Sequence, residues 1–253
     1  MSRFDLSSRI ALVSGSYRGL GLAIAEGLAE HGATVVLNGR NADGVAAAVA
    51  QLKQRKLAAT GYAFDVTDET AVKENIARIE REVGPIDIVV NSAGISPRQP
   101  AVDFKTEDYH AVLRTNIDGV FFVSREAARG MIARRRGKII SLGSIAGQMS
   151  RPKLAPYSAS KGAVHQLTKG LAVEWAPHNI QVNAIAPGLI RSDLTEVLRD
   201  DPAFVTWSES RIPAGRWGKP ADIAGAAIFL ASSAADYVTG HILVVDGGWT
   251  ANY

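Results

Sequence analysis

The sequence has no cysteine, little net charge and no long apolar run. The absence of cysteine among its 253 residues excludes disulfides, thiol nucleophiles and cysteine-ligated metals, and fits a reducing compartment. A net charge of +3 is too small to indicate a polyanion such as nucleic acid as partner. No run approaches the roughly 18 apolar residues of a membrane span, and residues 1–6 lack the apolar core of a signal peptide. These absences predict a soluble, cytoplasmic protein with neither a nucleic-acid nor a membrane partner.

Short apolar runs alternate with helical patterns along the chain. Strands are expected at Ile10–Ser14, Thr34–Asn38, Ala59–Asp65, Asp87–Val90, Lys138–Leu142, Gln181–Ile185 and Ile242–Val245. Most of them are continuously apolar, as strands covered on both faces are. Helices are expected at Leu20–Glu30, Ala42–Gln54 and Thr70–Val83. The alternation predicts a Rossmann-type α/β fold, a doubly wound parallel sheet of about seven strands, in a single domain over residues 1–253.

Three helix ends and one irregular segment stand out. Gly32 fits the position after the first helix, Thr106 an N-cap, and Pro220 the first turn of a helix at 221–231. Residues 188–218 contain two prolines and two tryptophans with little regular pattern. Long irregular segments in compact domains often serve as binding loops, so we expect a substrate lid there.

A glycine-rich loop directly follows the first strand. Its glycines let backbone N–H groups approach a pyrophosphate at the N-terminus of the next helix, although a purely structural turn would also use them. Tyr17 could cover the phosphates or pack on the surface. The predicted cofactor-binding residues of this loop are Gly15, Ser16, Tyr17, Arg18, Gly19, Leu20 and Gly21.

The end of the second strand carries Asn38, where NAD-binding units usually have a carboxylate for the ribose 2′-hydroxyl. Arg40 follows, and Arg18 lies in the glycine loop; an arginine can hold a 2′-phosphate with two hydrogen bonds. This pattern favours NADP(H) over NAD(H), although Asp43 could also fold back toward the ribose. Asp65 could bond an adenine edge or cap a helix.

Tyr157 and Lys161 stand four residues apart in a predicted helix at 155–176, and Ser144 lies upstream. Residues at this spacing share a helix face. A nearby ammonium favours the phenolate, and a lowering of the tyrosine pKa by roughly 3 units would make an acid/base catalyst near neutral pH. A core tyrosine beside a solvated lysine is the alternative.

These motifs resemble, as an ordered set, those of the short-chain dehydrogenases/reductases. The resemblance implies that Ser144 binds the substrate oxygen and Tyr157 transfers the proton. It implies that Lys161 holds the nicotinamide ribose and lowers the tyrosine pKa, and that Asn116 anchors a proton-relaying water. The further cofactor-binding positions that it implies are Asp65, Val66, Asn91, Ala93, Gly94, Tyr157, Lys161, Pro187, Gly188, Ile190 and Ser192. Ser92 and Ser192 depart from the family's usual asparagine and threonine but keep hydrogen-bonding side chains. Hydride transfer to a nicotinamide needs no metal, and a homotetramer is implied.

Within that family the chain is most similar to the sugar-acid dehydrogenases, in the segments 94–100, 203–207 and 211–218. A sugar acid requires a cation for its carboxylate and polar groups for its hydroxyls. The predicted substrate-binding residues are Arg98, Ser144, Gln148, Arg151, Tyr157 and Arg191. Three alternatives remain: a 3-dehydrogenase of a 2-deoxy sugar acid, a 3-oxoacyl carrier-protein reductase that docks its carrier on residues 129–136, and a cofactor-binding scaffold without catalysis.

Overall fold

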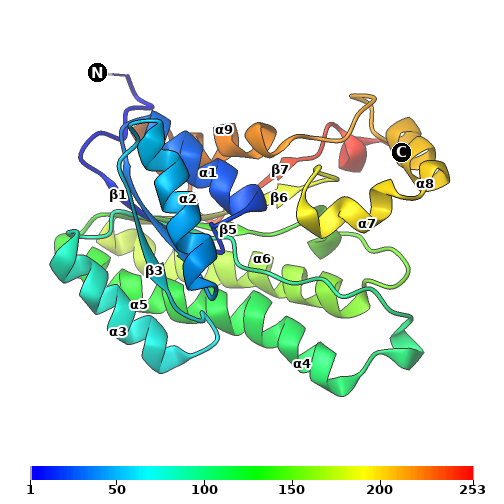
Figure 1. Cartoon of the computed structure of the whole chain (residues 1–253), viewed down its shortest axis with the longest axis horizontal. Helices are drawn as coiled ribbons and strands as arrows, with labels where there is room; N and C mark the ends of the chain where they lie inside the picture. The colour runs from blue at the N-terminus through cyan, green and yellow to red at the C-terminus, as the bar shows by residue number, and fades with distance from the viewer. Residues whose placement is uncertain (1, 253) are drawn as a thin grey trace.

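Seven parallel strands form one sheet in the computed structural model, in the order β3-β2-β1-β4-β5-β6-β7 (Figure 1). The strands are β1 Ile10–Ser14, β2 Thr34–Gly39, β3 Ala59–Ala63, β4 Ile88–Asn91, β5 Gly137–Leu142, β6 Ile180–Pro187 and β7 Ile242–Val245. The structure describes residues 2–252, with only the backbone of Leu194; Met1 and Tyr253, the ends of the predicted domain, lie outside the described residues. The predicted fold class is confirmed.

Helices cover both faces of the sheet because successive strand residues point to opposite sides. In β1, Ala11 and Val13 join one buried cluster and Leu12 joins the other. The first cluster lies under α1 Gly19–Glu30, α2 Ala42–Gln54 and α9 Pro220–Ala231. The second lies under α3 Glu69–Glu82, α5 Gly119–Arg134 and α6 Ala155–Trp175. Figure 1 shows these two helical layers, with α1, α2 and α9 on one side of the sheet.

The strand order reverses between β1 and β4, which lie side by side although two strands separate them in sequence. Open α/β sheets bind ligands in the crevice that such a reversal leaves at the carboxyl ends of the strands. The Ser14 hydroxyl at the end of β1 accepts hydrogen bonds from the N–H groups of Ser92 (3.1 Å) and Ala93 (3.2 Å) after β4. The glycine loop and the segment after β4 are therefore held together at this crevice.

Most predicted helix ends are confirmed. Gly32 has a left-handed φ of 98° directly after the cap of α1, and Pro220 is the first residue of α9. Thr106 does not cap a helix, because α4 Thr106–Leu113 already includes it and Lys105 precedes it without a capping side-chain bond. A π-helical turn, Arg114–Asp118, joins α4 to α5.

The predicted lid segment contains two short helices, α7 Glu196–Arg199 and α8 Pro202–Arg211. Trp217 at its end is 2% exposed, and its indole N–H donates to Ser208 of α8. Trp207 packs edge-on against Trp249, which anchors α8 to the C-terminal turn. The motion of a lid stays a prediction. No helix of the described residues is long and apolar enough to cross a membrane.

Candidate active site

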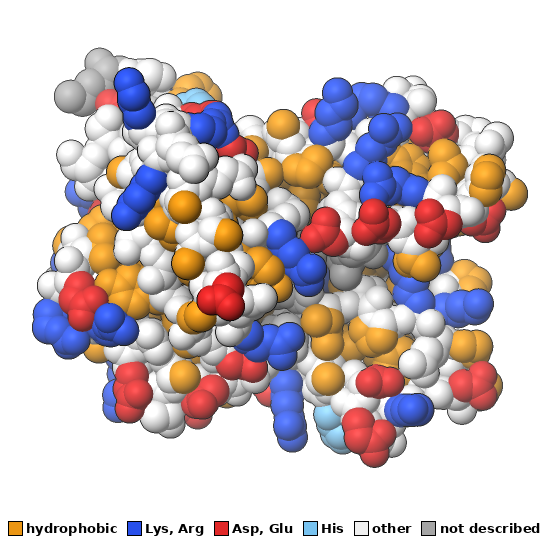
Figure 2. All heavy atoms as spheres, viewed as in Figure 1, with side chains coloured by type: hydrophobic (Ala, Val, Ile, Leu, Met, Phe, Trp, Pro, Cys, Tyr) orange, Lys and Arg blue, Asp and Glu red, His pale blue; other side chains and the backbone are white. Residues whose placement is uncertain are grey.

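A cavity of about 870 Å³ runs along the carboxyl ends of the strands. Figure 2 shows this face of the molecule hollowed between its two halves, with lysine and arginine side chains around the hollow. The cavity is lined by the following predicted site residues: Gly15, Tyr17, Arg18, Gly19, Leu20, Gly21, Asn38, Arg40, Asp65, Val66, Ala93, Gly94, Arg98, Ser144, Arg151, Tyr157, Lys161, Pro187, Gly188, Ile190 and Ser192.

The glycine loop forms a cradle in which backbone approaches backbone. Gly15 has a φ of 60°, and a Cβ atom there would lie 2.7 Å from the Cα of Ala93. A Cβ on Gly21 would overlap the carbonyl oxygen of Gly15 and lie 2.9 Å from the Cα of Ser16. Only glycine fits at these two positions, and the loop precedes the N-terminus of α1. The cradle therefore suits a dinucleotide pyrophosphate.

At the end of β2 the amide of Asn38 donates to the carbonyls of Tyr62 (3.2 Å) and Phe64 (3.1 Å). This orientation ties β2 to β3 and leaves the Asn38 Oδ1 atom buried without a partner among the described residues. Arg40 and Arg18 are exposed at the cavity rim, where Arg40 lies 3.8 Å from Asp65 and Arg18 lies 3.6 Å from Asp193. Exposed ion pairs of this kind contribute little energy, so both arginines are available to an anionic ligand.

Asp65 does not cap a helix, because Asp68 is the N-cap of α3, and its bond to an adenine edge stays a prediction. One carboxylate oxygen accepts from the backbone N–H and the hydroxyl of Thr67, each at 2.9 Å, which stabilises the turn before α3. The other faces Arg40.

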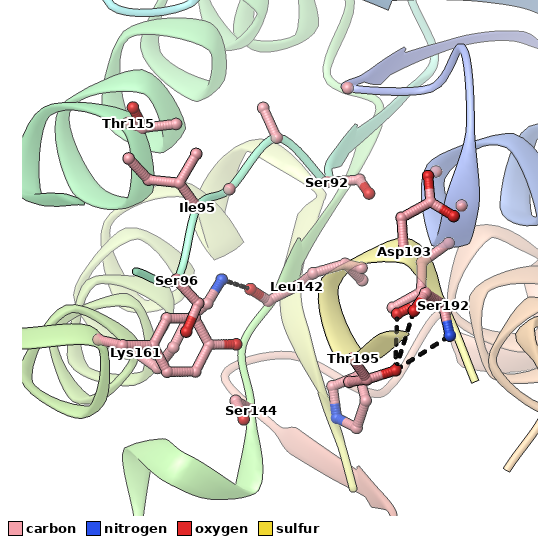
Figure 3. A pocket seen from close by; sticks show the side chains of 18 of the residues that line it. Ser92, Ile95, Ser96, Thr115, Leu142, Ser144, Lys161, Ser192, Asp193 and Thr195 are labelled. Carbon is pink, nitrogen blue, oxygen red and sulfur yellow. Dashed lines mark hydrogen bonds between the residues drawn. The ribbon is translucent and has the colours of Figure 1, made fainter. Parts of the chain in front are cut away.

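Tyr157, Lys161 and Ser144 meet in the cavity wall. Tyr157 and Lys161 lie one turn apart on α6, and the Lys161 Nζ atom is 5.7 Å from the centre of the Tyr157 ring. The ammonium is buried and donates to the carbonyl of Leu142 at 2.6 Å, as Figure 3 shows. The Ser144 hydroxyl hydrogen-bonds to the phenol. The helical spacing in the sequence correctly predicts that Tyr157 and Lys161 lie on one face of α6, while Ser144 joins them from the segment after β5.

The predicted lowering of the Tyr157 pKa is wrong for the protein by itself. Burial raises the pKa of the phenol, and the hydrogen bond from Ser144 and the charge of Arg98 only partly counteract it. Burial also lowers the pKa of Lys161 to about 8. Sequence spacing correctly places Lys161 near the phenol, but the pKa of Tyr157 is dominated by desolvation, which outweighs the charge of Arg98 and which spacing does not measure.

Asn116 lies beneath the cavity wall, in the π-helical turn. Its side chain accepts from the N–H of Ile95 (2.9 Å) and donates to the carbonyl of Ile95 and the hydroxyl of Ser160, both at 3.0 Å. Asn116 thus fixes the loop after β4 against α6. The relay water predicted at Asn116 stays a prediction, while the side chain itself acts as a positioning group.

Arg98 and Arg151 are half-buried in the cavity wall, and Arg98 is close enough for its charge to act on Tyr157. Neither guanidinium has an ion-pair partner among residues 2–252. Burial lowers the pKa of both, and the charge of Arg98 contributes to the lowering at Arg151, so the two cations are close enough to repel each other. The Arg151 guanidinium also lies 5.0 Å from the ring centre of Phe204 on α8. Two neighbouring cations without counter-charges in a cleft form a site for an anion.

Five predicted site residues, Asn116 included, do not line the cavity. Ser16 and Asn91 are buried, and their side chains bond within the sheet region, to Val13 and to Ser124 and Ser141. Gln148 is exposed beyond the turn that carries Ser144. Arg191 is exposed and lies 4.0 Å from Glu209 of α8. Sequence spacing predicts which residues lie near a site. The conformation of the turn that carries each residue determines where its side chain points.

Three groups that line the cavity were missed in the sequence. The Leu142 carbonyl holds Lys161, and a backbone acceptor leaves no trace in side-chain motifs. Asp193 faces Arg18. The Ser96 hydroxyl is buried without a partner among the described residues. In the sequence, its place between Ile95 and Pro97 in the segment after β4 could have indicated that it belongs to the site.

Comparison with known proteins shows which proteins this chain resembles. A family model described as Enoyl-(Acyl carrier protein) reductase matches residues 15–250. Gluconate 5-dehydrogenase of Gluconobacter oxydans (strain 621H) is 47% identical over 249 residues, which cover 98% of this chain and 97% of that protein. The 5-keto-D-gluconate 5-reductase of Escherichia coli (strain K12) is 42% identical over 245 residues, which cover 97% and 96%.

A solved structure is similar over the same extent. The crystal structure of a gluconate 5-dehydrogenase from Burkholderia cenocepacia J2315 in complex with NADP and tartrate has a TM-score of 0.97 and 48% identity, and the match covers 99% of this chain and 98% of that one. The cradle, the serine–tyrosine–lysine group and these full-length similarities lead to one assignment. The chain belongs to the short-chain dehydrogenase/reductase family.

Proposed function

We propose that the protein is an NADP-dependent oxidoreductase that interconverts D-gluconate and 5-keto-D-gluconate. The observation that carries this proposal is the pair of half-buried arginines, Arg98 and Arg151, without carboxylate partners beside Tyr157. A sugar acid bound with its carboxylate at these cations would extend its hydroxyls toward Ser144 and Tyr157. The names of the relatives reported above support the same substrate class.

NADP, when bound, supplies or accepts the hydride. Gly15 and Gly21 would receive its pyrophosphate, and Arg18 and Arg40 its 2′-phosphate. Ser144 binds the oxygen on the reacting carbon, and Tyr157 gives a proton to that oxygen in reduction or takes one from it in oxidation. Because burial raises the pKa of Tyr157, the phenol is protonated at neutral pH and ready for reduction, whereas oxidation is favoured as the pH rises.

The carrier-protein alternative gains no support from the basic stretch at 129–136. Arg129 pairs with Glu126, Arg134 with Glu80 and Arg136 with Asp87. Arg135 donates to the carbonyl of Pro177. These side chains are engaged within the chain, as cations near a helix end commonly are.

Assembly and compartment belong to the same proposal: a homotetramer that acts in the cytoplasm. All four residues of β7, the edge strand of the sheet, are only half-buried, which supports a subunit contact there. Light scattering of the purified protein would test the tetramer.

The test of the function is a substrate panel with both cofactors. Gluconate with NADP⁺ should give a rise in reduced-nicotinamide absorbance, and NAD⁺ should give a slower one. 2-Deoxygluconate distinguishes a 3-dehydrogenase, and a 3-oxoacyl thioester with NADPH distinguishes a carrier-protein reductase. Turnover of either of these in preference to gluconate and 5-ketogluconate would overturn the substrate assignment and leave the family unchanged.

A further inference from the structure

The ring of Tyr17 fills a slot between two glycines at the 2′-phosphate end of the cleft. A Cβ atom on Gly39 would overlap the Cδ1 atom of Tyr17 and lie 2.9 Å from Cε1. On the opposite ring edge, a Cβ on Gly44 would lie 2.9 Å from Cδ2 and 3.3 Å from Cε2. The ring therefore cannot move away from one glycine without approaching the other.

Both glycines of the slot belong to regular secondary structure. Gly39 is the last residue of β2 and is buried, and Gly44 lies in the first turn of α2. The Asn41 side chain accepts from the N–H of Gly44 at 3.0 Å, which fixes the turn between the strand and the helix. Tyr17 itself is half-buried and packs against the cluster that contains Val45. The turn between β2 and α2 therefore encloses the Tyr17 ring from both edges.

A positively charged side chain lies close to the Tyr17 ring. The Arg18 guanidinium lies 5.3 Å from the Tyr17 ring centre, within cation–π range. Arg18 is exposed, and among residues 2–252 its other contact is with Asp193, at 3.6 Å, so the ring contributes to its position. Arg40 lines the cavity next to Gly39.

The ring has a second consequence for cofactor choice. NAD-binding units place a carboxylate at the end of the second strand, where it bonds the ribose 2′-hydroxyl. In this chain Asn38 and Gly39 are the two residues at the end of that strand. The Asn38 amide is bonded to β3, and the ring occupies the space that any side chain at position 39 would enter. A carboxylate is therefore excluded sterically at the place where it would favour NADH.

We propose that Tyr17 is a positioning residue for cofactor choice: its ring blocks a carboxylate at position 39 and supports Arg18 for the 2′-phosphate. This inference rests on the proposed use of NADP. It makes Tyr17, which touches the cavity from the glycine loop, a determinant of which dinucleotide binds and not of the chemistry.

Equilibrium binding of NADPH and NADH, followed by nucleotide fluorescence, tests the inference without turnover. Tyr17→Ala should weaken NADPH binding by about 2–5-fold, the range for an exposed cation–π contact, and leave NADH within about 2-fold. Tyr17→Phe keeps the ring and should bind NADPH as the wild type does. Tyr237→Ala, at a fully exposed tyrosine remote from the cleft, is the matched control and should change neither affinity.

The sharper test is a double-mutant cycle with Gly39→Asp. With Tyr17 present, the aspartate must displace the ring, so melting temperature and both affinities should fall. With Tyr17→Ala, the aspartate should be accommodated, and preference should move toward NADH by at least about 10-fold relative to Tyr17→Ala alone. Circular dichroism confirms that each variant is folded, and the Tyr17→Ala single variant still decides the case if Gly39→Asp does not fold.

The outcomes separate this inference from the function on which it rests. If the wild type does not bind NADPH more tightly than NADH, the proposed cofactor preference fails. If the wild type does prefer NADPH, but Tyr17→Ala weakens both nucleotides equally or Gly39→Asp has the same effect with and without the ring, the role of Tyr17 is refuted alone.

Discussion

The cofactor side of the cleft is shaped by backbone, whereas the substrate side is shaped by charge. Between β1 and β4 the walls are glycines, carbonyls and serine hydroxyls that hydrogen-bond within the chain, such as Ser14 to Ser92 and Ala93. Toward α8 the wall offers Arg98 and Arg151, whose guanidinium groups have no counter-charge among the described residues. The cofactor side therefore fits a ligand of one shape. The substrate side suits an anionic group but does not determine the rest of the ligand.

The largest effect is expected at the boundary between the two sides, where Tyr157 stands. Tyr157→Phe removes the proposed proton donor and should lower kcat by about 10²–10⁴-fold, the usual contribution of general acid–base catalysis. NADPH affinity should stay within about 2-fold, because the hydroxyl lost serves proton transfer. Stopped-flow turnover and fluorescence titration measure the two quantities. A variant with a near-normal kcat would rule out Tyr157 as the proton-transfer group.

One methyl group added at Gly21 should disrupt cofactor binding on the backbone-shaped side of the cleft. Gly21→Ala would place a Cβ against the Gly15 carbonyl and the Ser16 Cα, and overpacking of this kind costs about 1–3 kcal/mol, so NADPH affinity should fall by up to about 100-fold. Gly225→Ala on α9 is the matched control, because a Cβ there meets nothing within 4 Å and the helix gains from alanine. Isothermal titration with NADPH compares them. Equal affinities would show that the cradle does not hold the dinucleotide.

The charge-shaped side is broken by neutralising Arg98. Loss of a hydrogen bond to a charged group costs about 1.5–3 kcal/mol, so Arg98→Met should raise KM for gluconate by about 10–100-fold. NADPH affinity should not change. Arg191→Met is the control: the sequence predicts that Arg191 also binds the substrate, but in the structure it does not line the cavity and lies 4.0 Å from Glu209. A KM that responds to Arg191 and not to Arg98 would reverse the assignment.

The two sides also differ in how far the sequence alone could define them. The seven strands, the cradle and the Tyr157–Lys161 pair follow from periodicity and spacing, because both are fixed by helix and strand geometry. Among the predicted substrate contacts, Gln148 and Arg191 turn away from the cavity while Arg98 and Arg151 enter it. Local sequence patterns do not encode packing. Packing determines the direction of side chains on irregular turns, the position of backbone acceptors such as Leu142, and the desolvation of Tyr157.

The smallest expected effect concerns Lys161, which joins the two sides through its buried ammonium. Its pKa is about 8 in the folded protein and about 10.4 for an unperturbed lysine. Below pH 8 the unfolded chain therefore binds this proton more tightly, so the buried charge reduces stability there. As the pH rises from 7 to 9 the folded side chain becomes neutral, and its contribution to stability should increase by about 1 kcal/mol.

Urea unfolding at pH 7, 8 and 9 measures this contribution as the difference between the wild type and Lys161→Met, since other titrating groups are common to both. The wild type should gain stability relative to the variant over this range. Lys169→Met, at an exposed lysine about two turns further along α6, is the control and should show no such pH-dependent difference. A wild type that loses stability relative to Lys161→Met would show that the Leu142 carbonyl and its surroundings favour the charged ammonium, which would make the catalytic wall more polar than its burial indicates.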